Sequence, residues 1–171
     1  MSKKLGLILL LMGLAGRSWA VIGIAEIKGT AEDSKIKGTV RLEDTPHGLH
    51  VMAQLIGVSP GDHGFHIHEF GDCSEMGKAA GGHYNPMNTP HGNVLKDGIQ
   101  KAHVGDMGNI TANGNWEATL DVILHGVALA GQKNTVGGRA IILHEKADDF
   151  SQPAGNAGSR IGCGTIVITG N

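Results

Sequence analysis

The sequence is poor in aromatic residues, in net charge and in long hydrophobic runs, and each shortage excludes a class of protein. Aromatic residues make up only 4% of the 171 residues. The formal net charge of −2 gives no sign of the basic surface that nucleic-acid binding or an acidic lipid surface would require. The apolar run from Leu5 to Ala15 is too short to span a bilayer. We therefore expect no nucleic-acid partner and no stable membrane insertion.

Glycine and histidine are abundant. The 28 glycines follow no collagen-like period, and this content is typical of an all-β protein with many tight turns. The 10 histidines are unusual, because histidine is a scarce residue that often serves as a metal ligand. An oxidising compartment would favour a disulfide between the two cysteines, Cys73 and Cys163, over two buried thiols that never meet.

Residues 1–20 have the pattern of a secretory signal peptide. Two lysines form a positive n-region, the apolar run follows, and Ser18 and Ala20 supply the small residues of a cleavage site. Val21 stands where a lipoprotein would have cysteine. We expect cleavage after Ala20, a mature domain of residues 21–171, and export to the periplasm or the extracellular space rather than a retained membrane anchor.

The mature sequence alternates between short β-like runs and turn residues. The expected strands are the runs 21–27, 36–42, 49–55, 110–111, 116–122, 140–143 and 165–169. Asn113-Gly114 predicts a hairpin turn between two of them. Since no segment reads as a convincing helix, the pattern favours an all-β sandwich or barrel. Two loops, 71–98 and 146–159, are long and rich in turn residues, and loops of this kind are usually functional or disordered.

Possible metal ligands gather beside these loops. His66 and His68 flank Ile67 on an expected strand, where alternation sends both imidazoles to one face. Such a pair alone is weak evidence for a metal. Downstream, however, stand further candidates: His83, His91, His103, Asp106 and His144. Imidazole nitrogen suits copper and zinc, and a single carboxylate among histidines is common for zinc. The set is too poor in oxygen ligands for calcium or magnesium.

Four segments resemble motifs of the copper,zinc superoxide dismutase family. They are 64–72 (GFHIHEFGD), 81–86 (GGHYNP) with His91-Gly92 and 103–106 (HVGD), 138–145 (GRAIILHE), and 155–160 (GNAGSR) with Cys163-Gly164. The motifs occur in the family's order, and the resemblance covers nearly all of the chain after residue 20. Cys73 follows His68 by five positions, which is similar to the bacterial secreted or periplasmic members.

The resemblance implies a Greek-key β-sandwich or barrel of about eight antiparallel strands with two long functional loops. It also implies one copper and one zinc ion per subunit. Copper would be held by His66, His68, His83 and His144. Zinc would be held by His83, His91, His103 and Asp106, so that His83 bridges the two metals. Asp148 would link a copper-ligand histidine to a zinc-ligand histidine, and Cys73 and Cys163 would form a disulfide.

The activity implied is the dismutation of superoxide to dioxygen and hydrogen peroxide, with Arg160 and His83 as catalytic residues. The main alternative is a non-catalytic copper-binding or copper-delivery protein on the same fold, and a purely structural zinc protein is a second. A delivery protein is expected to lose a copper ligand or the arginine, or to gain a Cys-x-Cys site, and this sequence does none of these. We further expect a homodimer formed through an apolar β surface.

Overall fold

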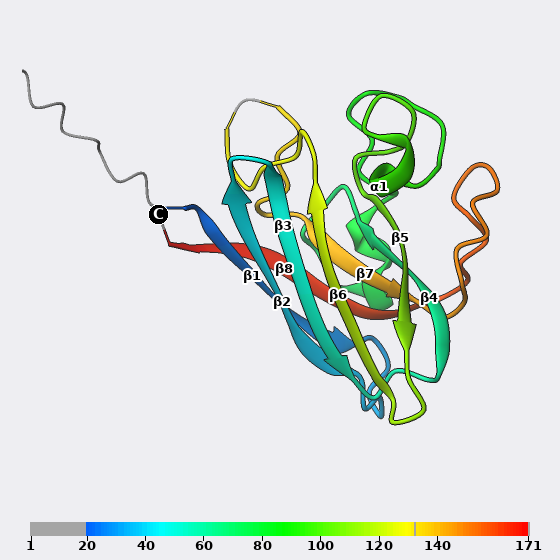
Figure 1. Ribbon diagram of the computed structural model, residues 1–171. Coiled ribbons are helices and arrows are strands. Elements are labelled where there is room, and N and C mark those ends of the chain that lie inside the picture. The colour runs from blue at the N-terminus through cyan, green and yellow to red at the C-terminus, as the bar shows by residue number, and fades with distance from the viewer. Residues whose placement is uncertain (1–19, 132, 171) are drawn as a thin grey trace, which may run out of the picture.

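Alternating aliphatic residues form a closed barrel of antiparallel strands (Figure 1). The computed structural model describes residues 20–131 and 133–170. Its strands are β1 (Ile22–Gly29), β2 (Lys37–Thr45), β3 (Gly48–Ile56), β4 (Gly61–Ile67), β5 (Asp106–Ala112), β6 (Glu117–Leu124), β7 (Ala140–His144) and β8 (Arg160–Gly170). Their order around the barrel is β1-β2-β3-β6-β5-β4-β7-β8. The predicted all-β fold of about eight antiparallel strands is therefore confirmed.

Two connections skip over neighbouring strands. The chain passes from β3 to β4 across β6 and β5, and from β6 to β7 across β5 and β4, as in a Greek-key arrangement. These crossovers bring β4 and β7, which lie far apart in the sequence, side by side with Phe65 opposite Leu143. The pairing of β4 with β7 is what positions the candidate site.

The barrel interior is aliphatic. On β3, the alternate residues Leu49, Val51, Ala53 and Leu55 are at most 1% exposed, as expected for a strand with one face in the core. The strand β7 differs, because all five of its residues are buried. Its outer face is covered by the disulfide-bearing segment after β4, which forms a second small cluster around Ile142.

The two long loops leave the barrel on the side of β4 and β5 (Figure 1). The first contains two short helical segments that the sequence did not reveal, the 3-10 helix η1 (Glu75–Ala80) and α1 (Val94–Asp97). The second is the connection between β7 and β8, drawn in orange. In the described part of the chain, no helix has both the length and the apolar character needed to cross a membrane.

The hairpin turn that Asn113-Gly114 predicted is present between β5 and β6. Asn113 and Glu117 are joined by a backbone hydrogen bond of 2.8 Å, and Ala112 pairs with Ala118. The left-handed residue of this turn is Trp116, at φ 64°. The Asn113 Oδ1 atom accepts hydrogen bonds from two backbone N–H groups of the turn and so stabilises it.

Candidate metal centres

The pairing of β4 with β7 places three histidines on one outer face of the barrel. Phe65 and Ile67 lie fully buried in the core, so strand alternation turns His66 and His68 outward. His144, the last residue of β7, comes to the same side. The strand β4 ends at Ile67, and His68 continues it as an isolated β-bridge.

That bridge joins His68 to His83 of the first loop and completes a group of four imidazoles. We call it the all-histidine group: His66, His68, His83 and His144. One ring nitrogen of each lies within 4.8 Å of the others, and all four residues are buried. The backbone register of the barrel thus brings together the residues that the resemblance assigned to copper.

Hydrogen bonds fix which nitrogen of each ring faces the centre of the all-histidine group. His68 Nδ1 donates to the Gly81 carbonyl at 3.0 Å, and His144 Nδ1 donates to the Gly158 carbonyl at 3.3 Å. Their Nε2 atoms and His66 Nδ1 are buried without any hydrogen-bond partner. Unpartnered buried nitrogens are rare in proteins, and lone pairs that converge in this way suit a metal ion.

Burial keeps these three imidazoles neutral. It lowers the pKa of His66 to about 4, that of His68 to about 2 and that of His144 to about 3, and the mutual repulsion of the ring charges acts in the same direction. A neutral imidazole is the form that binds a metal, so the pKa values fit the same use.

A second group surrounds the carboxylate of Asp106 at the start of β5. We call it the aspartate group: His83, His91, His103 and Asp106. The Asp106 Oδ1 atom lies 2.8 Å from His83 Nδ1 and 3.1 Å from His103 Nδ1, and its Oδ2 atom lies 2.8 Å from His91 Nδ1. Three imidazole nitrogens and one carboxylate in a tight cluster match the ligand types of a zinc site.

The carboxylates reverse the effect of burial in this group. Burial alone would lower the pKa of His91, but Asp106 and Asp148 outweigh it and raise this pKa to about 9. Burial alone would raise the pKa of Asp106, but hydrogen bonds from His103, His83 and His91 hold it well below its usual range. The Asp106 carboxylate is therefore ionised and available to a cation, and His91 releases its proton when it binds a metal.

His83 belongs to both groups. Its Nδ1 atom points to Asp106, so its Nε2 atom is the one left to face the all-histidine group. The His83 ring centroid lies 4.2 Å from that of His66 and 5.2 Å from that of His91. One imidazole can thus supply one nitrogen to each of two metal ions.

Asp148 links the two groups through hydrogen bonds to one histidine of each. Its Oδ2 atom accepts from His66 Nε2 at 2.9 Å, and its Oδ1 atom accepts from His91 Nε2 at 3.0 Å. A carboxylate in this position fixes the tautomer and orientation of each ring. Gly155 permits this close approach, because a Cβ atom there would lie 1.8 Å from Asp148 Oδ1.

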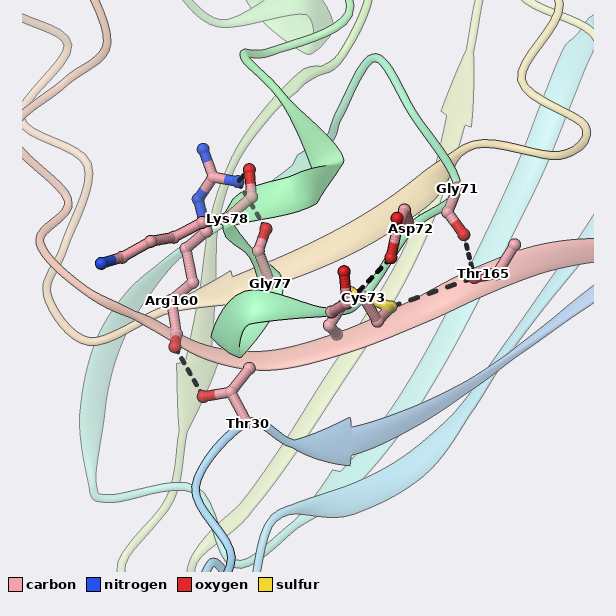
Figure 2. Close-up of a disulfide and its surroundings, with 10 residues drawn as sticks. Thr30, Gly71, Asp72, Cys73, Gly77, Lys78, Arg160 and Thr165 are labelled. Atoms are coloured by element: carbon pink, nitrogen blue, oxygen red, sulfur yellow. Dashed lines mark hydrogen bonds between the residues drawn. A yellow bond between two sulfur atoms is a disulfide. The ribbon is translucent and has the colours of Figure 1, made fainter.

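Arg160 lies at the open side of the all-histidine group. Together with His68, His83 and His144 it lines a hollow of about 310 Å³ that the loop before β8 also borders. Figure 2 shows its guanidinium directed at the η1 segment, where it donates to the Gly77 carbonyl at 2.5 Å. It also donates to the carbonyl of Gly81, directly after η1, at 2.6 Å. Its backbone carbonyl accepts a hydrogen bond from Thr30. The arginine is therefore held in one orientation beside the hollow.

The expected disulfide between Cys73 and Cys163 is present (Figure 2). It joins Cys73, just before η1, to Cys163 of β8, across a sequence separation of 90 residues. Since η1 supplies carbonyls to Arg160, the disulfide also supports the wall on which that side chain rests.

Comparison with known proteins gives a consistent picture. The family model for copper/zinc superoxide dismutase matches residues 36–166. Superoxide dismutase [Cu-Zn] 3 of Arabidopsis thaliana is 38% identical over 81% of this chain and 87% of its own length. Superoxide dismutase [Cu-Zn] 5 of Dictyostelium discoideum is 36% identical over 85% of this chain and 97% of its own. The chain belongs to the copper/zinc superoxide dismutase family.

Two further relatives extend the comparison. An extracellular superoxide dismutase [Cu-Zn] of Brugia pahangi is 33% identical over 81% of this chain and 73% of its own length. A crystal structure of the clock protein EA4 superposes with a TM-score of 0.77 at 34% identity, over 90% of this chain and 98% of that one. The fold described here is thus shared with that structure over nearly the whole of both chains.

The sequence-based interpretation missed two polar residues of this family member. Asn109 of β5 and Gln152 of the loop before β8 bind the backbone of Asp148 and His91 respectively. Nothing in the sequence singles out either carboxamide, because their partners are backbone groups 39 and 61 positions away. Only the folded chain reveals them.

Proposed function

We propose that this protein is an exported enzyme that dismutates superoxide to dioxygen and hydrogen peroxide. In this proposal the all-histidine group holds copper, the aspartate group holds zinc, and each subunit contains one ion of each. The observation that carries the proposal is His83, which belongs to both groups while the remaining nitrogens of the all-histidine group converge without hydrogen-bond partners.

When bound, copper supplies a one-electron couple that oxidises one superoxide and reduces a second, and zinc supplies a fixed positive charge. His83 has the geometry to move a proton. Its Nδ1 atom stays with the aspartate group, and its Nε2 atom can take up one of the two protons that peroxide formation requires. Asp148 keeps His66 and His91 in place during the cycle.

Arg160 is proposed to guide the anion. Removal of residues 1–20 would leave 11 basic and 16 acidic residues, a net charge of −5, and such a chain repels superoxide at long range. The attraction must therefore be local. A guanidinium fixed beside the hollow is always charged and presents paired donors to a small anion.

A charge series at this position tests that role. Arg160→Lys should keep much of the activity, Arg160→Ala less and Arg160→Glu very little, with copper occupancy unchanged. The rate of the parent enzyme should fall with rising salt, and less steeply in Arg160→Ala, because screening then has less attraction to remove. If Arg160→Glu with full copper matches the parent at low salt, the guiding role is wrong.

The function itself is tested on the metal-reconstituted mature protein. We expect equal amounts of copper and zinc, a visible d–d absorption band and superoxide dismutase activity. A protein that binds copper in this way but does not dismutate superoxide would be a copper-binding or copper-delivery protein instead. A protein that binds zinc alone would be a structural zinc protein.

Export is proposed from residues 1–20, of which 1–19 lie outside the described residues. We infer cleavage after Ala20 and a secreted or periplasmic location of the bacterial type, which the short step from His68 to Cys73 and the disulfide support. The extracellular relative from Brugia pahangi also favours export. Sequencing the N-terminus of exported protein should give Val21 first; finding Met1 or Ser2 would contradict this proposal.

We also propose a homodimer through the outer face of β1 and β8. Ile24 pairs with Val167 across these strands, and Val167 is 57% exposed. Exposed neighbouring aliphatic side chains favour a protein contact. Light scattering should give the mass of two chains, and a monomer mass at micromolar concentration would refute the dimer.

A further inference from the structure

The backbone of His91 is held on both sides by one side chain. Gln152 Oε1 accepts a hydrogen bond from the His91 N–H at 3.0 Å, and Gln152 Nε2 donates to the His91 carbonyl at 2.8 Å. A carboxamide is suited to this because it carries a donor and an acceptor side by side. The pair of bonds fixes both the position and the direction of the His91 peptide.

A second carboxamide holds the partner of His91 in the same way. Asn109 Oδ1 accepts from the Asp148 N–H at 2.7 Å, and Asn109 Nδ2 donates to the Asp148 carbonyl at 3.0 Å. The contact between Asp148 and His91 is thus fixed at both ends, from β5 and from the loop before β8. The two anchors differ, because Asn109 belongs to a barrel strand and Gln152 to a loop.

The position of Gln152 connects the aspartate group to the entrance of the hollow. Pro153 and Ala154 follow it directly, and both line the hollow beside His68, His83 and His144. The two hydrogen bonds of Gln152 therefore join the His91 backbone to the segment that forms this wall.

We propose that Gln152 is a positioning residue that ties the wall of the hollow to the aspartate group, so that zinc binding orders the entrance through which the substrate reaches the all-histidine group. The proposal rests on the proposed function, since it assumes zinc in the aspartate group. It acts through the His91 backbone, in addition to the carboxylate contact that Asp148 makes with the His91 ring.

The test compares Gln152→Ala, Gln152→Glu and the parent, all as full-length mature protein with both metals. Gln152 is largely exposed, so its truncation leaves no buried cavity and the variant should fold. Gln152→Glu keeps the size and the acceptor but loses the donor to the His91 carbonyl. Gln54→Ala is the matched control, because Gln54 is an exposed glutamine on β3 outside both groups.

Two readouts other than activity are measured. Competition with a chromophoric chelator should show zinc affinity about tenfold lower in Gln152→Ala, a smaller loss in Gln152→Glu and none in Gln54→Ala. Hydrogen exchange should show that zinc protects residues 146–158 in the parent, and that this protection shrinks in Gln152→Ala even when zinc is saturating.

The outcomes separate the two proposals. If the parent binds zinc tightly while Gln152→Ala matches it in both zinc affinity and zinc-dependent exchange, the positioning role is wrong and the proposed function stands. If the parent itself binds no zinc, the proposed function fails and the role of Gln152 fails with it. A loss of protection in Gln152→Ala without zinc dependence would also overturn the inference, because the side chain would then be only structural.

Discussion

The all-histidine group and the aspartate group share His83, but the pKa of His68 in the first and the pKa of His91 in the second are shifted in opposite directions. In the all-histidine group, buried nitrogens have no partner, and burial lowers the pKa of His68 to about 2. In the aspartate group, carboxylates surround the imidazoles and raise the pKa of His91 to about 9. One site offers neutral lone pairs, and the other offers an ionised carboxylate paired with a protonated histidine.

Access to the surface differs in the same direction. Three members of the all-histidine group, His68, His83 and His144, line the hollow beside Arg160, whereas the aspartate group contributes only the shared His83. A reactant in this hollow therefore meets mainly the all-histidine group. The comparison indicates a division of work, in which the neutral group beside the hollow suits an ion that changes oxidation state and the group with the ionised carboxylate suits a fixed dication.

Replacing the shared residue should give the largest effect. His83→Ala removes one nitrogen from each group, so we expect both metals to be weakened and the dismutase rate to fall by about a hundredfold or more. His144→Ala should chiefly lose copper and His91→Ala chiefly zinc. Metal analysis by mass spectrometry decides, and equal loss of both metals in all three variants would contradict the division between the groups.

A glycine in the loop before β8 tests the link between the groups. In Gly155→Ala the new Cβ atom would lie 1.8 Å from Asp148 Oδ1 and 2.7 Å from His91 Nε2, so the link must shift. We expect zinc affinity to drop by about tenfold and the free energy of unfolding of the metal-loaded protein to fall by several kcal/mol.

Gly138→Ala is the control for this variant. Gly138 has a similar φ of 78°, against 73° for Gly155, but a Cβ atom there would meet nothing within 4 Å. It should therefore show only the backbone strain of about 1–2 kcal/mol, without loss of zinc. Chelator competition and urea denaturation measure the two quantities. Equal zinc loss in both variants would attribute the effect to strain instead of to the link.

The all-β fold was accessible from the sequence for a physical reason, and the two ligand groups were accessible through the family motifs. Alternation in strands such as β3 follows directly from the period of two, and the His66–His68 spacing carries the same information. The residues that the motifs assigned to copper and zinc lie in two clusters that share His83. The pairing of Cys73 with Cys163, which the resemblance implied, is also present.

Other features depend on contacts that no local pattern encodes. The segments η1 and α1 are too short to show helical periodicity in a glycine-rich loop. The left-handed residue at Trp116, where Gly114 would be the natural candidate, is set by the Asn113 side chain. The clamps of Asn109 and Gln152 engage backbone atoms, which every residue has, so they become visible only in the folded chain.

The smallest expected effect is the pH dependence of the protein after both metals are removed. His66, His68 and His144 have folded pKa values of about 4, 2 and 3, below the value of about 6.5 in the unfolded chain. As the pH falls below 6.5 the unfolded state takes up protons first, so the free energy of unfolding falls. Each of these three histidines should lower the free energy of unfolding by about 1 kcal/mol between pH 6.5 and 5.5, or by about 3 kcal/mol together.

His91 behaves in the opposite way, because its folded pKa of about 9 lies above the unfolded value. Its contribution to stability is nearly complete below pH 6.5 and is lost as the pH rises from 6.5 through about 9, so below pH 6.5 it adds almost nothing to the slope. Urea denaturation of the metal-free protein between pH 5.5 and 6.5 should therefore show a slope that His144→Ala reduces by about a third. His91→Ala should leave this slope intact, as should His47→Ala at an exposed turn. A slope that disappears in His91→Ala and persists in His144→Ala would reverse the assignment of neutral and charged groups on which the comparison stands.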